Sequence, residues 1–128
     1  PEFDQNYVVS AVLEGPRAKT EDIDRKMEES HSHRKESQPV GASAGCIFKN
    51  PKPTPAGMLV DQLGLKGKSR GGAIVSDVHG NFILNSGGAK ARDVLDLIAD
   101  IKERALTERG VTLETEVQII GEDQPMPL

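Results

Sequence analysis

Four stretches of the chain carry the β-branched and aliphatic residues that are typical of short strands. Turn-forming or polar residues follow each of them, so each stretch is expected to end in a turn or loop. The second and third flank a polar turn and are predicted to form a hairpin. These four strands are predicted over residues 7–13, 73–75, 81–84 and 117–120, and a fifth, shorter one at residues 47–48.

Three further segments are predicted to be helices. Residues 20–37 begin with the N-capping residue Thr20 and an acidic first turn, but apolar positions are few, so most of this helix should face water. Residues 56–63 and 89–109 carry apolar residues at helical spacing, and each is predicted to bury one face. The expected core positions are Leu59, Val60 and Leu63 in the first of these and Ala91, Val94, Leu95, Ile98, Ile101 and Ala105 in the second.

The order of these elements predicts the fold class. We expect an α+β fold, a small two-layer domain with a mainly antiparallel sheet packed against helices. The chain has 128 residues, enough for one modest domain, and aromatic residues are so few that Val, Ile, Leu and Ala must supply its core. Residues 122–128 are predicted to be a frayed tail. Residues 1–3, Pro-Glu-Phe, are compatible with a remnant of a cloning vector.

Composition argues against several classes of function. The net charge of −4 offers no general basic surface for nucleic acid. The single cysteine excludes an internal disulfide and a Cys-rich zinc site. No apolar run approaches the ~20 residues of a membrane-spanning helix, and no secretory signal is visible, so we expect a soluble, cytoplasmic protein.

Two short motifs suggest a metal site and a phosphate-binding loop, but the spacing of their residues argues against both. His31 and His33 lie two positions apart on a predicted helix, so their side chains would diverge rather than meet on a metal ion. Residues 67–69 are Gly-Lys-Ser, but Gln62 stands where a phosphate-binding P-loop needs its first glycine. We therefore expect a solvated helix face and a surface turn.

The candidate chemistry lies in residues 41–51, which contain the only cysteine of the chain. Small residues precede Cys46 and would let a ligand approach the backbone. Ile47 and Phe48 are predicted to form a short strand that ends at Pro51. From these residues alone, Cys46 is either a small buried hydrophobe, which is the commoner case, or a reactive group.

This segment resembles the G-S-x-F-K-N-P motif of the MurB family, the UDP-N-acetylenolpyruvoylglucosamine reductases of peptidoglycan synthesis. Its residues are Gly45-Cys46-Ile47-Phe48-Lys49-Asn50-Pro51. The likeness runs from about Tyr7 to Gly121 and covers only the C-terminal, substrate-binding part of the family. Residues 114–121 resemble the family's closing segment. The other matching positions are Ala56-Gly57, Leu59-Val60-Asp61, Gly64-Leu65-Lys66-Gly67, Gly72-Ala73, Val75-Ser76, His79, Asn81-Phe82-Ile83, Asn85 and Asp93-Val94.

The resemblance implies how the chain is divided and what it binds. Residues 1–14 would be a strand or linker from the end of a flavin-binding part that lies outside the chain. Residues 15–121 would be the MurB-type C-terminal substrate-binding domain, and residues 122–128 the tail. The implied partners are UDP-N-acetylglucosamine enolpyruvate and the N-terminal flavin domain of the same protein, in the bacterial cytoplasm.

The resemblance also implies a reaction, in which NADPH reduces FAD and the reduced flavin delivers hydride to the enolpyruvyl double bond. The resulting enolate must be stabilised and then protonated. Cys46 stands where the family carries a proton-donating serine, and Glu116 matches the catalytic glutamate of the closing segment. The cysteine departs from the family pattern, but a thiol is a stronger acid than a hydroxyl and can donate as long as it stays protonated.

Four further residues are implied to bind the substrate. Lys49 and Asn50 are suited to its phosphates or carboxylate, Arg34 to its diphosphate, and Asn81 lies in the hairpin that the family places near the substrate. Arg34 and Asn81 also have plainer interpretations, as a solvated helix charge and a turn residue. Lys49 lies three positions from Cys46 along a strand, so it should project to the opposite side and leave the thiol's pKa undisturbed.

The same resemblance implies that the chain is incomplete as an enzyme. It lacks the family's flavin-binding part, so FAD and NADPH are expected only in the parent enzyme, with no cofactor and no activity in this fragment. No metal is expected. The competing hypothesis is a non-catalytic nucleotide-sugar-binding module or an interaction domain.

Overall fold

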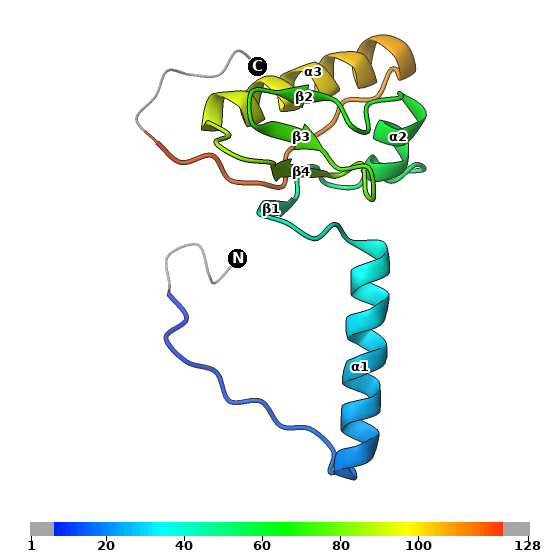
Figure 1. Ribbon diagram of the computed structural model, residues 1–128, viewed down its shortest axis with the longest axis vertical. Helices are drawn as coiled ribbons and strands as arrows, with labels where there is room; N and C mark the ends of the chain where they lie inside the picture. Colours follow the sequence, from blue (N-terminus) through cyan, green and yellow to red (C-terminus); the bar gives the residue numbers. More distant parts are fainter. Residues whose placement is uncertain (1–6, 122–128) are drawn as a thin grey trace. The chain divides into compact units, whose positions relative to one another are not determined.

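The computed structural model describes residues 7–121, and the predicted vector remnant and frayed tail lie outside this range. The chain divides into two compact units, Pro1–Ser32 and His33–Leu128. The second unit holds the sheet and the core, as Figure 1 shows. None of the helices formed by the described residues is long and apolar enough to cross a membrane.

Helix α1 spans Thr20–Ser37, the range that the sequence predicts. None of its residues is buried, and its two largest apolar side chains, Ile23 and Met27, are 45% and 58% exposed. His31 and His33 are both exposed, and residues 7–121 contain no group of three or more His, Cys, Asp or Glu side chains that could hold a metal ion. The expectation of a solvated helix is confirmed.

The strand predicted over residues 7–13 is wrong, because these residues form no regular structure. Their side chains are open to water, and Tyr7 and Val12 are 96% and 98% exposed. A strand requires a second strand to pair its backbone N–H and C=O groups. Within residues 7–121 no strand pairs with this segment, so its β-forming side chains cannot produce a strand by themselves.

The described residues form one four-stranded sheet, in which every neighbouring pair is antiparallel. The strand order is β1-β4-β3-β2. The β3–β4 hairpin was predicted to within one residue at each end, and β1 lies just before the expected position. The strands are β1 Ser43–Cys46, β2 Ser69–Arg70, β3 Ala73–Val75 and β4 Phe82–Asn85.

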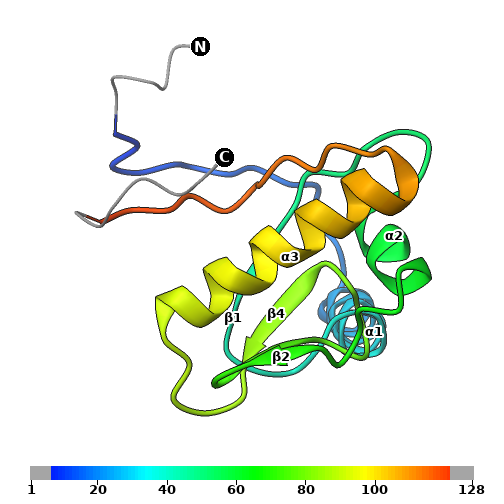
Figure 2. The same cartoon turned by 90° about the horizontal axis from the view of Figure 1, so that it is seen from above.

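Helices α2 (Ala56–Gln62) and α3 (Ala91–Arg109) complete the two-layer α+β fold, which confirms the predicted class. Helix α3 lies across one face of the sheet, with α2 beside its C-terminal half (Figure 2). Two arginines of α3 hold the end of α2, because Arg104 donates to the carbonyl of Leu63 (3.0 Å) and Arg109 to that of Gln62 (3.3 Å).

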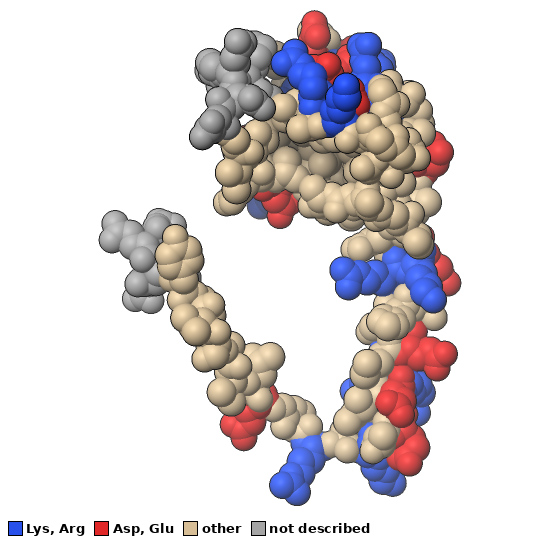
Figure 3. Space-filling model, turned by 60° about the vertical axis from the view of Figure 1, so that its left-hand side comes forward, with Lys and Arg blue, Asp and Glu red and all other residues tan. Residues whose placement is uncertain are grey.

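The core lies between the sheet and these two helices and consists almost wholly of aliphatic side chains. All three predicted positions of α2 are buried. In α3 the prediction is partly wrong, because Ala91 is exposed in the first turn and Leu97 is buried instead. The outer side of α3 carries both signs of charge side by side, as the top of Figure 3 shows.

The strand predicted over residues 117–120 is also wrong. The closing segment pairs with the rest of the fold through a single bridge between Phe48 and Thr115, and it continues without regular structure. Ile119 and Ile120 are 50% and 90% exposed. Because no strand among the described residues lies beside this segment, its β-forming residues form no ladder.

The turn that precedes β4 packs directly on α2, and it can do so because glycines leave room at the contact. A Cβ atom added to Gly80 would lie 2.6 Å from the carbonyl oxygen of Gly57 and 3.0 Å from Cβ of Val60. The first of these distances is shorter than real Cβ contacts allow, and the crowded atom belongs to the backbone of a helix. The turn and α2 must therefore separate if a side chain is added.

We predict that Gly80→Ala lowers the free energy of unfolding by about 1–3 kcal/mol, because it forces this contact apart. Gly15→Ala is the control, since no atom of the described residues lies within 4 Å of its added Cβ. Urea denaturation of both variants measures the difference. Equal urea midpoints for the two variants would show that the turn accommodates the added Cβ atom without a loss of stability.

Candidate functional site

A groove of about 370 Å³ opens in the second unit, where the end of β1, helix α2 and the turn before β4 meet. The walls thus come from three segments that lie far apart in the sequence. The groove is lined by Cys46, Asn50, Pro55, Gly57, Met58, Asp61, Lys66, Val78, His79, Gly80 and Asn81.

Cys46 is the last residue of β1, where it pairs with Phe82 of β4, and it is half-buried. Partial burial raises the pKa of its thiol above the ordinary value, and the negative charge of Glu116 raises this pKa further. Both effects favour the neutral form. Cys46 therefore keeps its proton at neutral pH, as the sequence predicts for a donor, and is not a ready thiolate nucleophile.

Glu116 reaches this neighbourhood because the closing segment runs alongside the residues that follow β1. The backbone N–H of Glu116 donates to the carbonyl of Ile47 (2.8 Å), and the N–H of Lys49 donates to the carbonyl of Glu114 (2.9 Å). The structure thus brings together the two predicted catalytic residues, Cys46 and Glu116, from opposite ends of the second unit.

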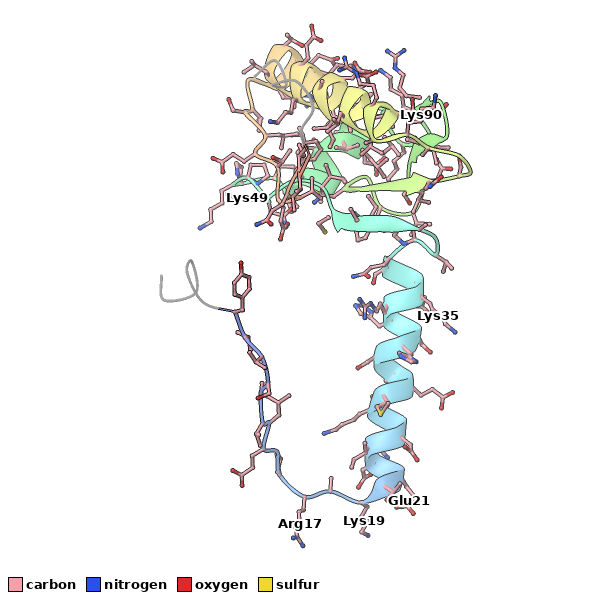
Figure 4. The ribbon with its side chains drawn as sticks, turned by 90° about the vertical axis from the view of Figure 1, so that its left-hand side faces the viewer. Arg17, Lys19, Glu21, Lys35, Lys49 and Lys90 are labelled. Atoms are coloured by element: carbon pink, nitrogen blue, oxygen red, sulfur yellow. The ribbon has the colours of Figure 1, made fainter. Side chains whose placement is uncertain are left out.

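Lys49 lies outside the groove, and its side chain points away from the body of this unit (Figure 4). Its ammonium forms an exposed ion pair with Glu114, with a nitrogen–oxygen distance of 3.0 Å. The causes of the Cys46 pKa shift do not include Lys49, in agreement with the prediction that it projects away from the thiol. Substrate binding by Lys49 stays a prediction, and its position outside the groove does not support it.

Asn50 lines the groove and also supports one of its walls. Its side-chain oxygen accepts a hydrogen bond from the backbone N–H of Ala56 (3.0 Å), the first residue of α2. Among the described residues its amide nitrogen donates to no partner, so this NH₂ group is free to meet a ligand. The predicted binding role is therefore compatible with the geometry.

Asn81 lies at the groove with its side chain buried, only 1% exposed. Both polar atoms of its side chain are bonded to the backbone of Phe48. Direct contact with a substrate stays a prediction, and both of these atoms already have a partner within the chain.

Arg34 lies in the last turn of α1, where its Nε donates to the side-chain oxygen of Gln38 (3.2 Å). This hydrogen bond is exposed to solvent, and Arg34 does not line the groove. Its predicted contact with a diphosphate remains a prediction.

Sequence reasoning assigned no role to three polar residues that the structure places in the groove. Lys66 and Asp61 form an ion pair of 2.9 Å, and the half-buried His79 packs against Gly57. Nδ1 of His79 accepts a hydrogen bond from the backbone N–H of Asn81 (3.2 Å), so a neutral His79 carries its proton on Nε2. All three residues occur in the matched positions given above, which is the signal that could have identified them.

The groove thus combines the Lys66–Asp61 ion pair with hydrogen-bonding side chains and a protonated thiol. Lys66, His79 and the amide of Asn50 provide donors that suit an anionic ligand. The Cys46 thiol keeps its proton at neutral pH, and Glu116 lies close enough to raise its pKa. This arrangement is suited to holding a charged ligand while one of its atoms is protonated.

Comparisons with known proteins show the family to which the chain belongs. The family model "UDP-N-acetylenolpyruvoylglucosamine reductase, C-terminal domain" matches residues 36–120. The UDP-N-acetylenolpyruvoylglucosamine reductase of Bacillus licheniformis is 50% identical over 115 residues, which is 89% of this chain and 62% of that protein. That of Bacillus subtilis (strain 168) is 46% identical over 114 residues, 88% of this chain and 38% of that protein.

A solved structure shows the same relationship. The crystal structure of UDP-N-acetylenolpyruvylglucosamine reductase (MurB) from Thermus caldophilus matches with a TM-score of 0.65 and 46% identity, over 77% of this chain and 34% of that one. The chain therefore spans less than two thirds of the length of each of these relatives. It belongs to the UDP-N-acetylenolpyruvoylglucosamine reductase (MurB) family and corresponds to the C-terminal domain.

Proposed function

We propose that this chain is the substrate-binding and proton-donating part of an oxidoreductase of peptidoglycan synthesis in the bacterial cytoplasm. The enzyme would convert UDP-N-acetylglucosamine enolpyruvate to UDP-N-acetylmuramate. The observation that carries the proposal is the half-buried Cys46 thiol, which faces the groove with a raised pKa beside Glu116 in a member of this family.

The groove does not fit FAD by itself. Its volume is about 370 Å³, which is too small to enclose a dinucleotide. We therefore assign FAD and NADPH to the part of the longer enzyme that lies outside this chain. Bound there, the flavin would supply hydride chemistry to the reaction.

Hydride addition to one carbon of the enolpyruvyl double bond leaves an electron pair on the neighbouring carbon, delocalised into the carboxylate. Cys46 donates its proton to that carbon, and the thiolate formed is reprotonated from solvent before the next turnover. The raised pKa keeps the Cys46 thiol protonated at neutral pH, and the negative charge of Glu116 contributes to this. Glu116 is also the family's candidate for stabilising or protonating the enol intermediate.

The remaining groove residues hold the substrate. Lys66, His79 and Asn50 are placed to meet its phosphates or carboxylate, with Met58 and Val78 as apolar contacts. On the strength of the family resemblance, Arg34 stays a further candidate for the diphosphate and Lys49 for the phosphates or the carboxylate.

We predict that Cys46→Ala, made in the longer enzyme, slows oxidation of the reduced flavin by substrate about 10²–10⁴-fold, the range typical of a lost general acid. Reduction of the flavin by NADPH should stay at the parent rate, because that step needs no proton from this chain. Cys46→Ser should keep substantial activity. Rapid-mixing absorbance measurements separate the two steps.

An unchanged rate of flavin oxidation in Cys46→Ala would remove Cys46 from the chemistry and make it a packing residue. Two results together would support the competing hypothesis of a non-catalytic nucleotide-sugar-binding module. The chain would bind UDP-sugar, and substitutions of Cys46 and Glu116 would leave the turnover of the longer enzyme unchanged.

A second prediction concerns the thiol itself and needs only this chain. The pH profile of Cys46 alkylation by iodoacetamide should have its midpoint above that of an exposed thiol. Glu116→Gln should lower the midpoint only in part, because burial is the larger cause of the raised pKa. Glu114→Gln is the matched control and should change nothing, since Glu114 pairs with Lys49. A midpoint at the ordinary value in the parent chain would contradict the proposed environment.

A third prediction tests whether the nucleotide sugar binds in the groove or outside it. Lys66→Met should weaken binding of UDP-N-acetylglucosamine about 10-fold or more, since it removes a charge-assisted hydrogen bond and leaves Asp61 unpaired beside the anion. Lys49→Met removes an ammonium outside the groove and should have a smaller effect. NMR titration of the chain measures both affinities. A larger loss in Lys49→Met would place the diphosphate outside the groove.

A further inference from the structure

Asn81 is one of only two buried polar residues among those that the structure describes; the other is Ser76. A buried primary amide is costly unless its oxygen and nitrogen are both hydrogen-bonded. In Asn81 both atoms have partners, and both partners belong to the backbone of Phe48, two positions after Cys46.

The geometry of this contact imitates the pairing of two strands. The side-chain oxygen of Asn81 accepts from the N–H of Phe48, and its side-chain nitrogen donates to the carbonyl of Phe48, both at 2.8 Å. The two residues that face each other in an antiparallel ladder exchange two such bonds. The main-chain carbonyl of Asn81 also accepts from the N–H of Ile47 (2.9 Å).

A side chain performs this pairing because the backbone cannot. Strand β4 begins at Phe82, which faces Cys46, and the chain before it bends into the turn that packs on α2. No backbone of this hairpin is left opposite Phe48, and the amide of Asn81 takes its place. The pairing of β1 with β4 is thereby extended by two residues beyond Cys46.

The other edge of the same two residues is held by the closing segment. Ile47 accepts a bond from the N–H of Glu116, and Phe48 forms a bridge with Thr115. Residues 47–48 are thus clamped between Asn81 on one side and the segment that carries Glu116 on the other. Cys46 directly precedes this clamp.

We propose that Asn81 is a positioning residue, which holds the backbone next to Cys46 so that its thiol stays fixed relative to the groove and to Glu116. This inference rests on the proposed function, in which Cys46 donates the proton. Asn81 itself touches no reacting atom, and it acts through Phe48 and Ile47. A displacement of a donor by about 1 Å can cost on the order of 100-fold in rate.

Asn81→Ala tests this role in the chain itself, through the pH profile of Cys46 alkylation. The titratable groups around the groove are Asp61, Lys66 and His79, with Glu116 beside the thiol, and none of them is changed by the substitution. Loss of the clamp should expose the thiol and loosen its approach to Glu116, so the alkylation midpoint should fall toward that of an exposed thiol.

Asn85→Ala is the matched control. The side-chain oxygen of Asn85, at the other end of β4, also accepts two backbone bonds, from Gly87 (3.0 Å) and Ala89 (3.1 Å). This variant should lose stability without moving the Cys46 midpoint. If Asn81→Ala shows no cooperative unfolding transition, Asn81→Ser, which removes less volume, is measured instead.

Hydrogen exchange in the parent chain is a further measurement. The backbone amide proton of Phe48 should exchange with solvent as slowly as the amide protons of the core residues.

The longer enzyme supplies a second readout. Asn81→Ala should slow oxidation of the reduced flavin by substrate about 10- to 100-fold, with little change in substrate affinity or in flavin reduction by NADPH. A midpoint that stays at the parent value in the folded Asn81 variant, or rapid exchange of the Phe48 amide in the parent chain, would overturn the proposal. The proposed function fails separately, if Cys46→Ala leaves flavin oxidation unchanged while the Asn81 variant still moves the thiol midpoint.

Discussion

The fold and the candidate site both depend on satisfying the backbone of two consecutive buried residues. Ile47 and Phe48 are each 1% exposed and belong to the core cluster, so their backbone N–H and C=O groups have no access to water. Asn81 pairs with one edge of this dipeptide and the closing segment with the other. The same hydrogen bonds that make the core possible therefore bring Cys46 and Glu116 to one place.

The walls of the groove are joined by contacts that leave no room for additional side-chain atoms. Gly57 of α2 lies under the imidazole of His79, and Gly80 lies against the carbonyl of Gly57. Asn50 binds the first backbone N–H of α2. The turn before β4, the start of α2 and the end of β1 are thus tied directly to one another. The groove residues of these three segments therefore hold fixed positions relative to one another.

The electrostatics of the site favour a proton donor over a nucleophile. Burial and a neighbouring carboxylate act in the same direction on the Cys46 thiol, and both raise its pKa. The nearest cation along the chain, Lys49, is paired with Glu114 and directed into solvent. A cysteine in this setting is compatible with the proposed donor role, because it is a stronger acid than a hydroxyl and still remains protonated at neutral pH.

The sequence by itself determined the helices, the β3–β4 hairpin, the fold class and the family, because apolar periodicity and a long ordered motif are local signals. Tertiary structure decided the rest. Residues 7–13 and 117–120 have strand-forming side chains, yet no strand among the described residues pairs with them, and strand formation depends on a partner. Likewise, no local pattern shows that the Asn81 amide replaces a missing strand residue or that Lys66 and His79 line the groove. Those outcomes depend on which distant segments meet, and only the packed chain brings them together.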